Sequence, residues 1–307
     1  MQINKTQLRN TLLLVMGAFI WGTAFVAQSV GSGYMGPFTF LASRSWLAVA
    51  FLGALVAVRH RTAAPKGAPV WVQPKTLVLG GAACGTALFA ASAAQQMGIG
   101  NTVSTAKAGF LTALYVVLVP VFGIFLGKRP GVKLWGCVAA SVAGLYLLCL
   151  AGRDTLAFTG GEWQLLLCAL LFTAQIMLVD RFSPRLDGIQ LSFMQFLVTA
   201  VLATAFMLAL EHPTPEQFRG AAVSVAYCGI LSSGVAYTLQ IVGQRDLDPT
   251  IASLAMCLES VFSALAGWVV LGQTLSPVEL AGCTLMFAAI VVSQLPDPRP
   301  RGARERA

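Results

Sequence analysis

Ten long apolar segments follow one another along the chain, and they limit what it can fold into more than any other feature. At 1.5 Å per residue, about 20 apolar residues in a helix cross a hydrocarbon core of roughly 30 Å. The predicted spans are residues 11–30, 38–58, 76–97, 104–125, 134–151, 163–179, 191–210, 221–242, 250–271 and 280–295. We therefore expect an all-α, polytopic membrane protein with ten transmembrane helices.

The composition supports this class. Hydrophobic residues make up 57% of the 307 residues and charged residues 10%, with a mean hydropathy of +0.76. A soluble domain has about 25% charged residues. The seven cysteines are scattered singly through the apolar segments, which is typical neither of a disulfide framework nor of a metal site. We expect no cofactor and no metal.

The chain also contains an internal duplication. A shift of 145 residues sets 95–127 on 240–272, and both stretches end in glycine followed by a polar loop. Gln95 falls on Gln240, Gly98 on Gly243, Thr105 on Thr250, and Gly127 on Gly272. Five spans per half is an odd number, so the second half enters the membrane from the opposite side. The sequence thus predicts two inverted five-helix repeats, 11–151 and 163–295, followed by a cytoplasmic, disordered tail at 296–307.

Basic residues predict the orientation. With the N-terminus in the cytoplasm, cytoplasmic segments hold 16 of the 20 Lys and Arg, and outside loops hold only Arg153 and Arg219. This is the asymmetry of the positive-inside rule. It accounts for the net charge of +8 without a nucleic-acid partner. Both termini are expected in the cytoplasm, and the lipid bilayer is the expected surrounding.

Motifs for catalysis are missing from the sequence. The two histidines, His60 and His212, fall in loops, and no phosphate-binding loop, HExxH or GxSxG motif occurs. We therefore expect a secondary transporter with alternating access and not an enzyme. An intramembrane enzyme, or a membrane sensor or scaffold without transport, is the alternative.

Three charged side chains fall within the predicted spans. Arg44 and Lys107 lie in the outer half, and Glu259 lies near the midplane. An ionisable residue at this depth usually faces a cavity or a partner. Glu259 either lines a polar pathway or bonds a neighbouring helix, and the two cations either face the cavity or reach out to the headgroups.

Uncharged polar and aromatic side chains add to this set, because lipid-facing helices tolerate few amides. Each amide either contacts a ligand or joins two helices. We also expect Trp21-Gly22 to break the first helix, and Pro120 to kink the fourth. The further candidates for substrate binding are Trp21, Gln28, Gln95, Tyr115, Gln175, Gln195, Tyr237 and Gln240.

The charges indicate the kind of substrate. Two cations against one acid favour a ligand with a carboxylate or comparable anionic group and an apolar body, an amino acid being the simplest case. Glu259 is the candidate for coupling, because desolvation favours the neutral form of a carboxyl group that has no cation nearby. It either carries a proton between the two sides or holds the substrate's amino group.

Several motifs resemble the drug/metabolite transporter superfamily, in particular its EamA-type ten-helix group. They are FIWGTAFVAQ (19–28), GPFTF before Arg44, AGFLTALYVVLVPVFG (108–123) before GKRPG, and LESVFSALAGWVVLGQTLS (258–276). The resemblance covers roughly 11–295. It implies a central cavity between the repeats, a bacterial inner-membrane location, and export of small metabolites such as amino acids. The assembly is expected to be a monomer or a homodimer.

The chain departs from the family pattern at two positions. The family often has Pro after the glutamate of the ninth helix and Glu after the next glycine, where this sequence has Ser260 and Gln273. We therefore expect the ninth helix to be straighter, and any role of the second acid to be missing.

Overall fold

The computed structural model describes residues 5–63, 69–100, 105–128, 130–151, 160–271 and 275–295. Ten helical spans within these ranges are long and apolar enough to cross a membrane, as the sequence predicts. The elements are α1 (Lys5–Ser32), α2 (Pro37–Ala63), α3 (Pro74–Gly100), α4 (Thr105–Ala113), α5 (Tyr115–Phe125), α6 (Val132–Cys149), α7 (Gly160–Phe182), α8 (Gly188–Leu210), α9 (Pro215–Ala226), the π-helix η1 (Tyr227–Ala236), α10 (Tyr237–Gln244), α11 (Pro249–Met256), α12 (Glu259–Leu271) and α13 (Pro277–Gln294). The chain is therefore an all-α, polytopic membrane protein.

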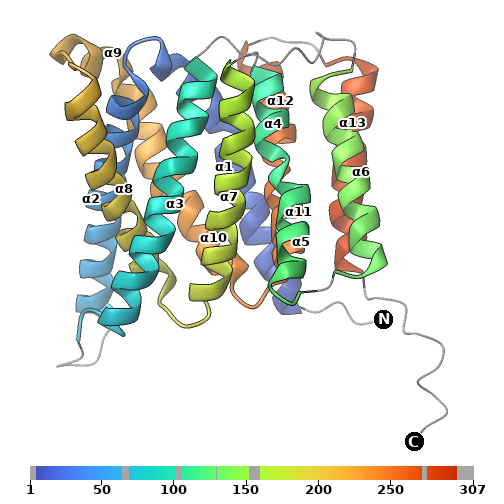
Figure 1. Cartoon of the computed structure of the whole chain (residues 1–307), viewed down its shortest axis with the longest axis horizontal. Helices are drawn as coiled ribbons and strands as arrows, with labels where there is room; N and C mark the ends of the chain where they lie inside the picture. The colour runs from blue at the N-terminus through green and yellow to red at the C-terminus, as the bar shows by residue number, and fades with distance from the viewer. Residues whose placement is uncertain are drawn as a thin grey trace, which may run out of the picture.

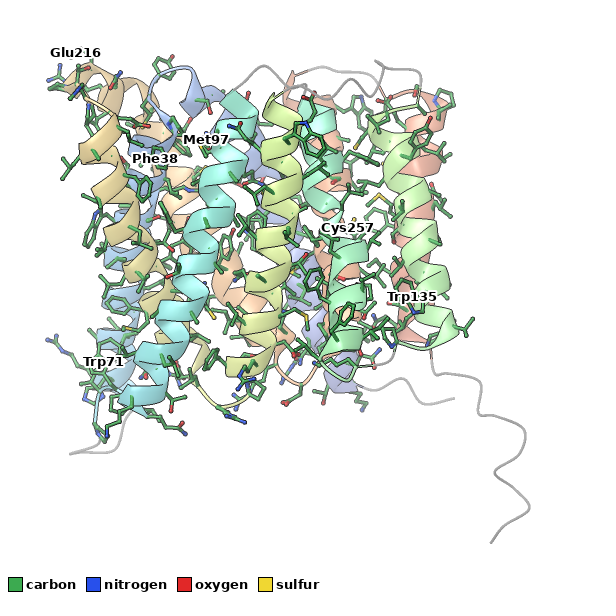
Figure 2. The ribbon with its side chains drawn as sticks, viewed as in Figure 1. Phe38, Trp71, Met97, Trp135, Glu216 and Cys257 are labelled. Carbon is green, nitrogen blue, oxygen red and sulfur yellow. The ribbon has the colours of Figure 1, made fainter. Side chains whose placement is uncertain are left out.

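The spans stand side by side, and α1 begins at the same lower face at which α13 ends (Figure 1). The lateral surface is apolar: Val132 is 90% exposed, Val223 84% and Phe125 81%. Glu216 and Trp71 lie at opposite ends of the bundle (Figure 2). An apolar belt between polar ends is what a lipid bilayer requires of the protein that crosses it.

The two five-helix repeats are interlaced. α2 lies along its repeat mate α8, α6 lies along its mate α13, and α3 packs on both α7 and α8. α1 in turn packs on α10, α11 and α12 of the second repeat. Since five spans make up each repeat, the second repeat runs through the membrane in the opposite sense to the first, and the repeats are inverted.

Two glycines bring α6 and α13 into close contact. A Cβ atom on Gly144 would lie 2.7 Å from the Gly282 carbonyl oxygen, and one on Gly282 would lie 2.5 Å from the Gly144 carbonyl oxygen. Small residues permit such backbone approach between membrane helices. Gly136, two turns before Gly144, has nothing within 4 Å of its Cβ position. The small-residue face of α6 thus joins two helices through Gly144.

Two spans are interrupted near their middle, and they are mates in the duplication. The fourth span changes from α4 to α5 at Leu114, and the ninth changes from α11 to α12 at Cys257 and Leu258. Discontinuous helices at the midplane are typical of transporter binding sites. The two residues that begin the second half-helices are Tyr115 and Glu259.

The expectation of a straighter ninth helix is wrong. The helix is broken although Ser260 replaces the proline. At the break, backbone N–H groups bond to carbonyl oxygens three residues earlier and not four. Leu258 N donates to Ala255 O at 3.3 Å, and Ser260 N donates to Cys257 O at 3.3 Å. A short stretch of this tighter bonding interrupts an α-helix without proline.

The expected break at Trp21-Gly22 is also wrong, because α1 is continuous from Lys5 to Ser32. Gly22 instead allows α12 to approach: a Cβ atom there would lie 2.6 Å from Phe262 Cβ and 2.7 Å from Glu259 O. In the fourth span, Pro120 lies inside α5, and the interruption falls at Leu114.

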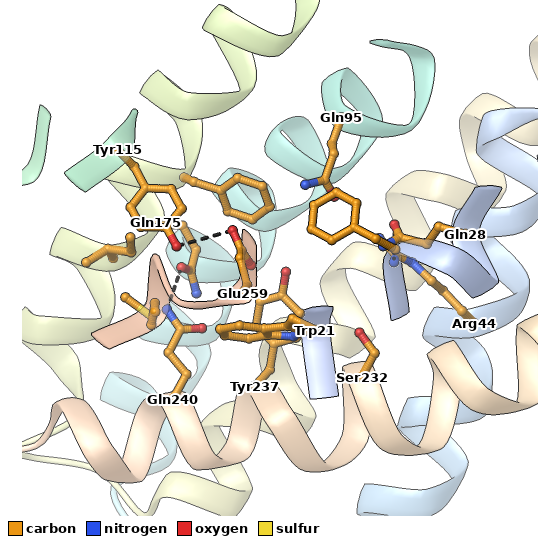
Figure 3. Close-up of a pocket in the computed structure, with 14 residues that line it drawn as sticks. Trp21, Gln28, Arg44, Gln95, Tyr115, Gln175, Ser232, Tyr237, Gln240 and Glu259 are labelled. Atoms are coloured by element: carbon orange, nitrogen blue, oxygen red, sulfur yellow. Dashed lines mark hydrogen bonds between the residues drawn. The ribbon is translucent and has the colours of Figure 1, made fainter. Parts of the chain in front are cut away.

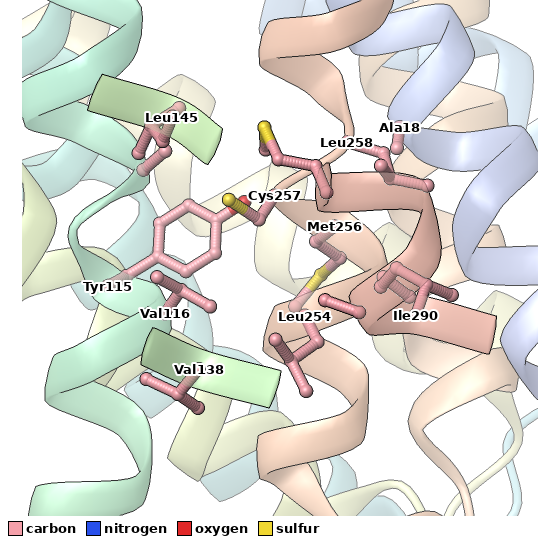
Figure 4. Close-up of a cluster of buried hydrophobic side chains, with 14 of the residues drawn as sticks. Ala18, Tyr115, Val116, Val138, Leu145, Leu254, Met256, Cys257, Leu258 and Ile290 are labelled. Atoms are coloured by element: carbon pink, nitrogen blue, oxygen red, sulfur yellow. The ribbon is translucent and has the colours of Figure 1, made fainter. Parts of the chain in front are cut away.

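A cluster of buried apolar side chains holds the two interrupted spans together (Figure 4). Val116 of α5 and Leu254 of α11 belong to it, together with Val138 of α6 and Ile290 of α13. All four are less than one-tenth exposed. The α6–α13 pair therefore forms an apolar wall behind the breaks.

The eighth span contains a ten-residue π-helix, which the sequence did not predict. Two of its glycines face α2. A Cβ atom on Gly229 would lie 2.8 Å from Leu47 Cβ, and one on Gly234 would lie 2.6 Å from Phe51 Cδ1. η1 therefore packs closely on α2, and its Ser232 lines the central cavity. π-turns inside α-helices occur frequently at functional sites.

Candidate functional site

A narrow cavity lies in the middle of the bundle, between helices of both repeats (Figure 3). About 40 Å³ of it is open to the centre of a water molecule. The residues that line it are Trp21, Phe25, Gln28, Arg44, Gln95, Tyr115, Phe172, Gln175, Ile176, Ser232, Tyr237, Gln240, Met256 and Glu259.

Arg44 is the cation of this cavity. It belongs to α2, and only 4% of the residue is exposed. Its Nη1 donates to Gln28 Oε1 at 3.1 Å, and the guanidinium carbon lies 5.8 Å from the centre of the Phe40 ring. Within the described ranges, no carboxylate lies within 4.0 Å of it, and its Nε has no hydrogen-bond partner. A buried charge without a counter-ion is costly, and an anion beside Arg44 would offset that cost.

Glu259 is the acid of the cavity, and it is 7% exposed. Tyr115 Oη donates a 3.2 Å hydrogen bond to its Oε1. Because Glu259 is the first residue of α12, its carboxylate also lies at the positive end of a half-helix dipole. Both the acid and its hydroxyl partner thus come from the two interrupted spans.

Amide side chains continue from Glu259 toward the end of α10. Gln240 Nε2 donates to Gln175 Oε1 at 3.0 Å and to Gln244 Oε1 at 2.9 Å. Gln244 Nε2 donates in turn to Ile176 O at 3.2 Å. All three glutamines are at most 2% exposed. A buried network of this kind fixes the helices that contribute to it.

Aromatic side chains form the middle of the cavity. The rings of Trp21 and Tyr237 lie edge to face with centroids 4.8 Å apart, and Phe196 supports Tyr237 from behind at 5.3 Å. Trp21 Nε1 is buried and lacks a hydrogen-bond partner in the described part of the chain. The indole can therefore donate to a ligand.

Nine of the eleven residues predicted from the sequence line this cavity. Gln195 does not: it is fully buried behind Gln175, whose Nε2 donates to Gln195 Oε1 at 3.5 Å. It joins α7 to α8, as amides between membrane helices often do. The side chain of Lys107 lies outside the described residues.

Five lining residues were not predicted: Phe25, Phe172, Ile176, Ser232 and Met256. Phe25 and Phe172 each stand three residues before a predicted amide, Gln28 and Gln175, on the same helix face. That spacing could have predicted both phenylalanines. No comparable pattern marks Ser232, because the side of the helix on which it lies depends on the π-helical backbone.

Two inverted five-helix repeats, two interrupted spans and a polar cavity where they meet are features found in many membrane transporters. The EamA-like transporter family model matches residues 9–150 and 159–294, one match in each half. The chain belongs to this family.

Its relatives are described as transporters or bear related names. An uncharacterized transporter of Archaeoglobus fulgidus is 27% identical, over 92% of this chain and 84% of its own length. The uncharacterized transporter YwfM of Bacillus subtilis is 24% identical over 97% of both chains. A chloroplastic WAT1-related protein of Arabidopsis thaliana is 24% identical over 93% of this chain and 69% of its own.

A solved crystal structure shares the fold, with a TM-score of 0.75 at 21% identity. It covers 93% of this chain, and this chain covers 96% of it. The family match and the relatives described as transporters together show a membrane transporter of the EamA type.

Proposed function

We propose that the protein exports a small metabolite bearing a carboxylate or comparable anionic group, and that Arg44 binds this group in the central cavity. The observation that carries the proposal is the environment of Arg44. It is 4% exposed, contacts the Gln28 amide and the Phe40 ring, and meets no acidic side chain within 4.0 Å in the described ranges. An anionic ligand would neutralise a charge that is otherwise buried alone.

Transport would proceed by alternating access. The repeats are inverted and interlaced, and the cavity takes its lining from both of them. The cavity is narrow and takes its lining from buried residues, so binding and release of a metabolite would require the surrounding helices to move. The interrupted spans and the π-helix are the places where the helices are least regular.

Glu259 is the group that we propose for coupling. It faces the cavity and comes from one of the interrupted spans, so its surroundings change when that span moves. As a proton carrier it would bind a proton from one side and release it to the other. As a fixed anion it would hold an amino group of the ligand. These roles do not exclude each other, and transport of an anion without an amino group separates them.

The basic residues support a location with both termini in the cytoplasm, as in a bacterial inner-membrane exporter. Amino acids and related carboxylates are the first class of ligand to test. The assembly would function as a monomer or a homodimer.

A thermal-shift screen of the purified protein tests the proposed ligand class, because a ligand that binds the native state raises the melting temperature. The compounds are amino acids, organic acids, nucleosides and quaternary ammonium salts. We expect carboxylates to stabilise the protein, Arg44→Ala to abolish the shift, and Gln195→Ala, outside the cavity, to retain it. Stabilisation by quaternary ammonium compounds alone would overturn the proposal.

A further inference from the structure

We propose that the cavity is built for a ligand whose anionic group and cationic or hydrogen-bond-donating group stand at opposite ends of a slender apolar body, and not on one carbon as in an α-amino acid. This inference rests on the proposed function, because it takes the anionic end to bind Arg44. It adds where the second polar group of the ligand lies and which residues recognise it.

Three buried polar atoms that line the cavity lack partners among the described residues: Trp21 Nε1, Arg44 Nε and Gln240 Oε1. A buried polar group without a hydrogen bond is costly, because it has lost its bonds to water and gained none in return. Their presence in one cavity indicates that a ligand or water supplies the missing hydrogen bonds. Two of the three are donors and one is an acceptor, so the missing partner must both accept and donate.

The cationic end of the cavity contains Arg44 and Gln28, which form one hydrogen-bonded pair. Ser232 of the π-helix lies on the same side of the cavity (Figure 3). A guanidinium with a free N–H and a nearby hydroxyl can bind a carboxylate through several charge-assisted hydrogen bonds. This end suits the anionic group of the ligand.

The acceptor end contains Glu259, whose Oε1 accepts from Tyr115, and Gln240, whose amide oxygen has no partner in the described ranges. Figure 3 shows these residues grouped with Gln175 on the side of the cavity away from Arg44. A carboxylate beside an amide oxygen suits an ammonium group, or a neutral group that donates hydrogen bonds.

Aromatic side chains contribute to the rest of the lining. Trp21 and Tyr237, in ring contact at 4.8 Å, lie next to Glu259 in Figure 3, and Arg44 lies on the far side of the cavity. Phe25 and Phe172 also line the cavity. These surfaces suit methylene groups and offer little to a charged group other than contact of a cation with a ring face. An α-amino acid carries both charges on one carbon, so it can satisfy one end of this cavity but not both.

Isomers that differ only in the position of the amino group test the inference directly. The probes are 6-aminohexanoate, its isomer norleucine, and hexanoate, with 4-aminobutyrate, 2-aminobutyrate and butyrate as the shorter set. Isothermal titration of the purified full-length protein measures each affinity. We expect 6-aminohexanoate or 4-aminobutyrate to bind at least about tenfold more tightly than its isomer and than the acid without an amino group.

Variants identify the residues responsible. Glu259→Gln should reduce the preference for the terminal amino acid over the simple acid to less than about threefold, because the charge-assisted bond is lost. The matched control is Glu216→Gln, which removes a carboxylate from α9 outside the cavity and should retain the tenfold preference. The comparison of isomers uses the unaltered protein, so it stands even where a variant fails to fold.

The outcomes separate this inference from the proposed function. If the α-amino isomers or the simple acids bind as tightly as the terminal amino acids, and Arg44→Gln weakens all of them, the separated-charge inference is wrong and the carboxylate ligand stands. If none of the six compounds binds, or if Arg44→Gln changes no affinity, both are wrong.

Discussion

Tyr115 and Glu259 meet at the centre of the molecule, where the tyrosine hydroxyl donates a 3.2 Å hydrogen bond to the carboxylate. They are 144 residues apart, almost the 145-residue period of the duplication. Each begins the second half-helix of an interrupted span, α5 for Tyr115 and α12 for Glu259. The two repeats therefore touch through equivalent breaks, and a polar contact crosses the pseudo-symmetric centre of the fold.

Loss of this contact should destabilise the protein. Tyr115→Phe removes the hydroxyl with little change of volume and leaves the buried carboxylate without its donor, at a cost of about 1–3 kcal/mol in unfolding free energy. Thermal unfolding in detergent measures the effect. The control is Tyr146→Phe on α6, where the side chain is 49% exposed and lies outside the central cavity. Equal stability of the two variants would contradict the assigned role of the contact.

The close approach of α6 and α13 gives a second stability prediction. Gly144→Ala places a methyl group 2.7 Å from the Gly282 carbonyl oxygen and 2.7 Å from Met286 Cγ, so we expect a loss of about 1–3 kcal/mol. Gly136→Ala on the same helix meets nothing within 4 Å and should gain up to about 1 kcal/mol from helix propensity. A Gly144→Ala variant that melts at the same temperature as Gly136→Ala would refute the proposed tight packing.

The distribution of basic residues predicts the orientation in the membrane. Sixteen Lys and Arg in the assigned cytoplasmic segments against two in the outside loops place both termini in the cytoplasm. A C-terminal tag should resist protease in intact cells and become sensitive after the cells are opened. Digestion of the tag in intact cells would show that the assignment is inverted.

Coupling through Glu259 can be separated from ligand binding with hexanesulfonate, which has no amino group for Glu259 to hold and, being ionised at every working pH, does not cross the bare bilayer as a neutral acid. In proteoliposomes, Glu259→Gln should abolish accumulation of hexanesulfonate driven by a pH gradient, because the variant cannot carry a proton. Counterflow exchange of hexanesulfonate should be largely kept. Loss of both activities would mark Glu259 as a residue needed for binding any anion, and full accumulation by the variant would leave it without a role in coupling.

The sequence was sufficient to predict the ten spans and most of the cavity. Span length follows from the length of each apolar run, and intramembrane charges such as Arg44 and Glu259 are too costly to face lipid. Whether an uncharged amide faces the cavity or another helix was harder to predict. Gln175 and Gln195 are the same residue type within apolar spans, and only one of them lines the cavity. Gln195 joins α7 to α8 through Gln175 and does not reach the cavity.

The interruptions of the helices could not be predicted from residue types. Proline and glycine were taken as signals, yet α1 is continuous through Gly22, and the fourth span is interrupted at Leu114 and not at Pro120. The ninth span breaks at Cys257 and Leu258. Breaks of this kind depend on contacts between spans, such as the bond from Tyr115 to Glu259, which a single sequence does not reveal.

The proposed function requires that a carboxylate bound to Arg44 crosses the membrane through this cavity. Counterflow of radiolabelled 6-aminohexanoate, a zwitterion that crosses a bare bilayer slowly, into preloaded proteoliposomes tests it most directly. We predict exchange above the protein-free background for the unaltered protein and for Gln195→Ala, whose site lies outside the cavity. Arg44→Ala should lower the exchange at least about tenfold, since it removes a charge-assisted bond to the carboxylate. Equal counterflow by Arg44→Ala and the unaltered protein would contradict the claim.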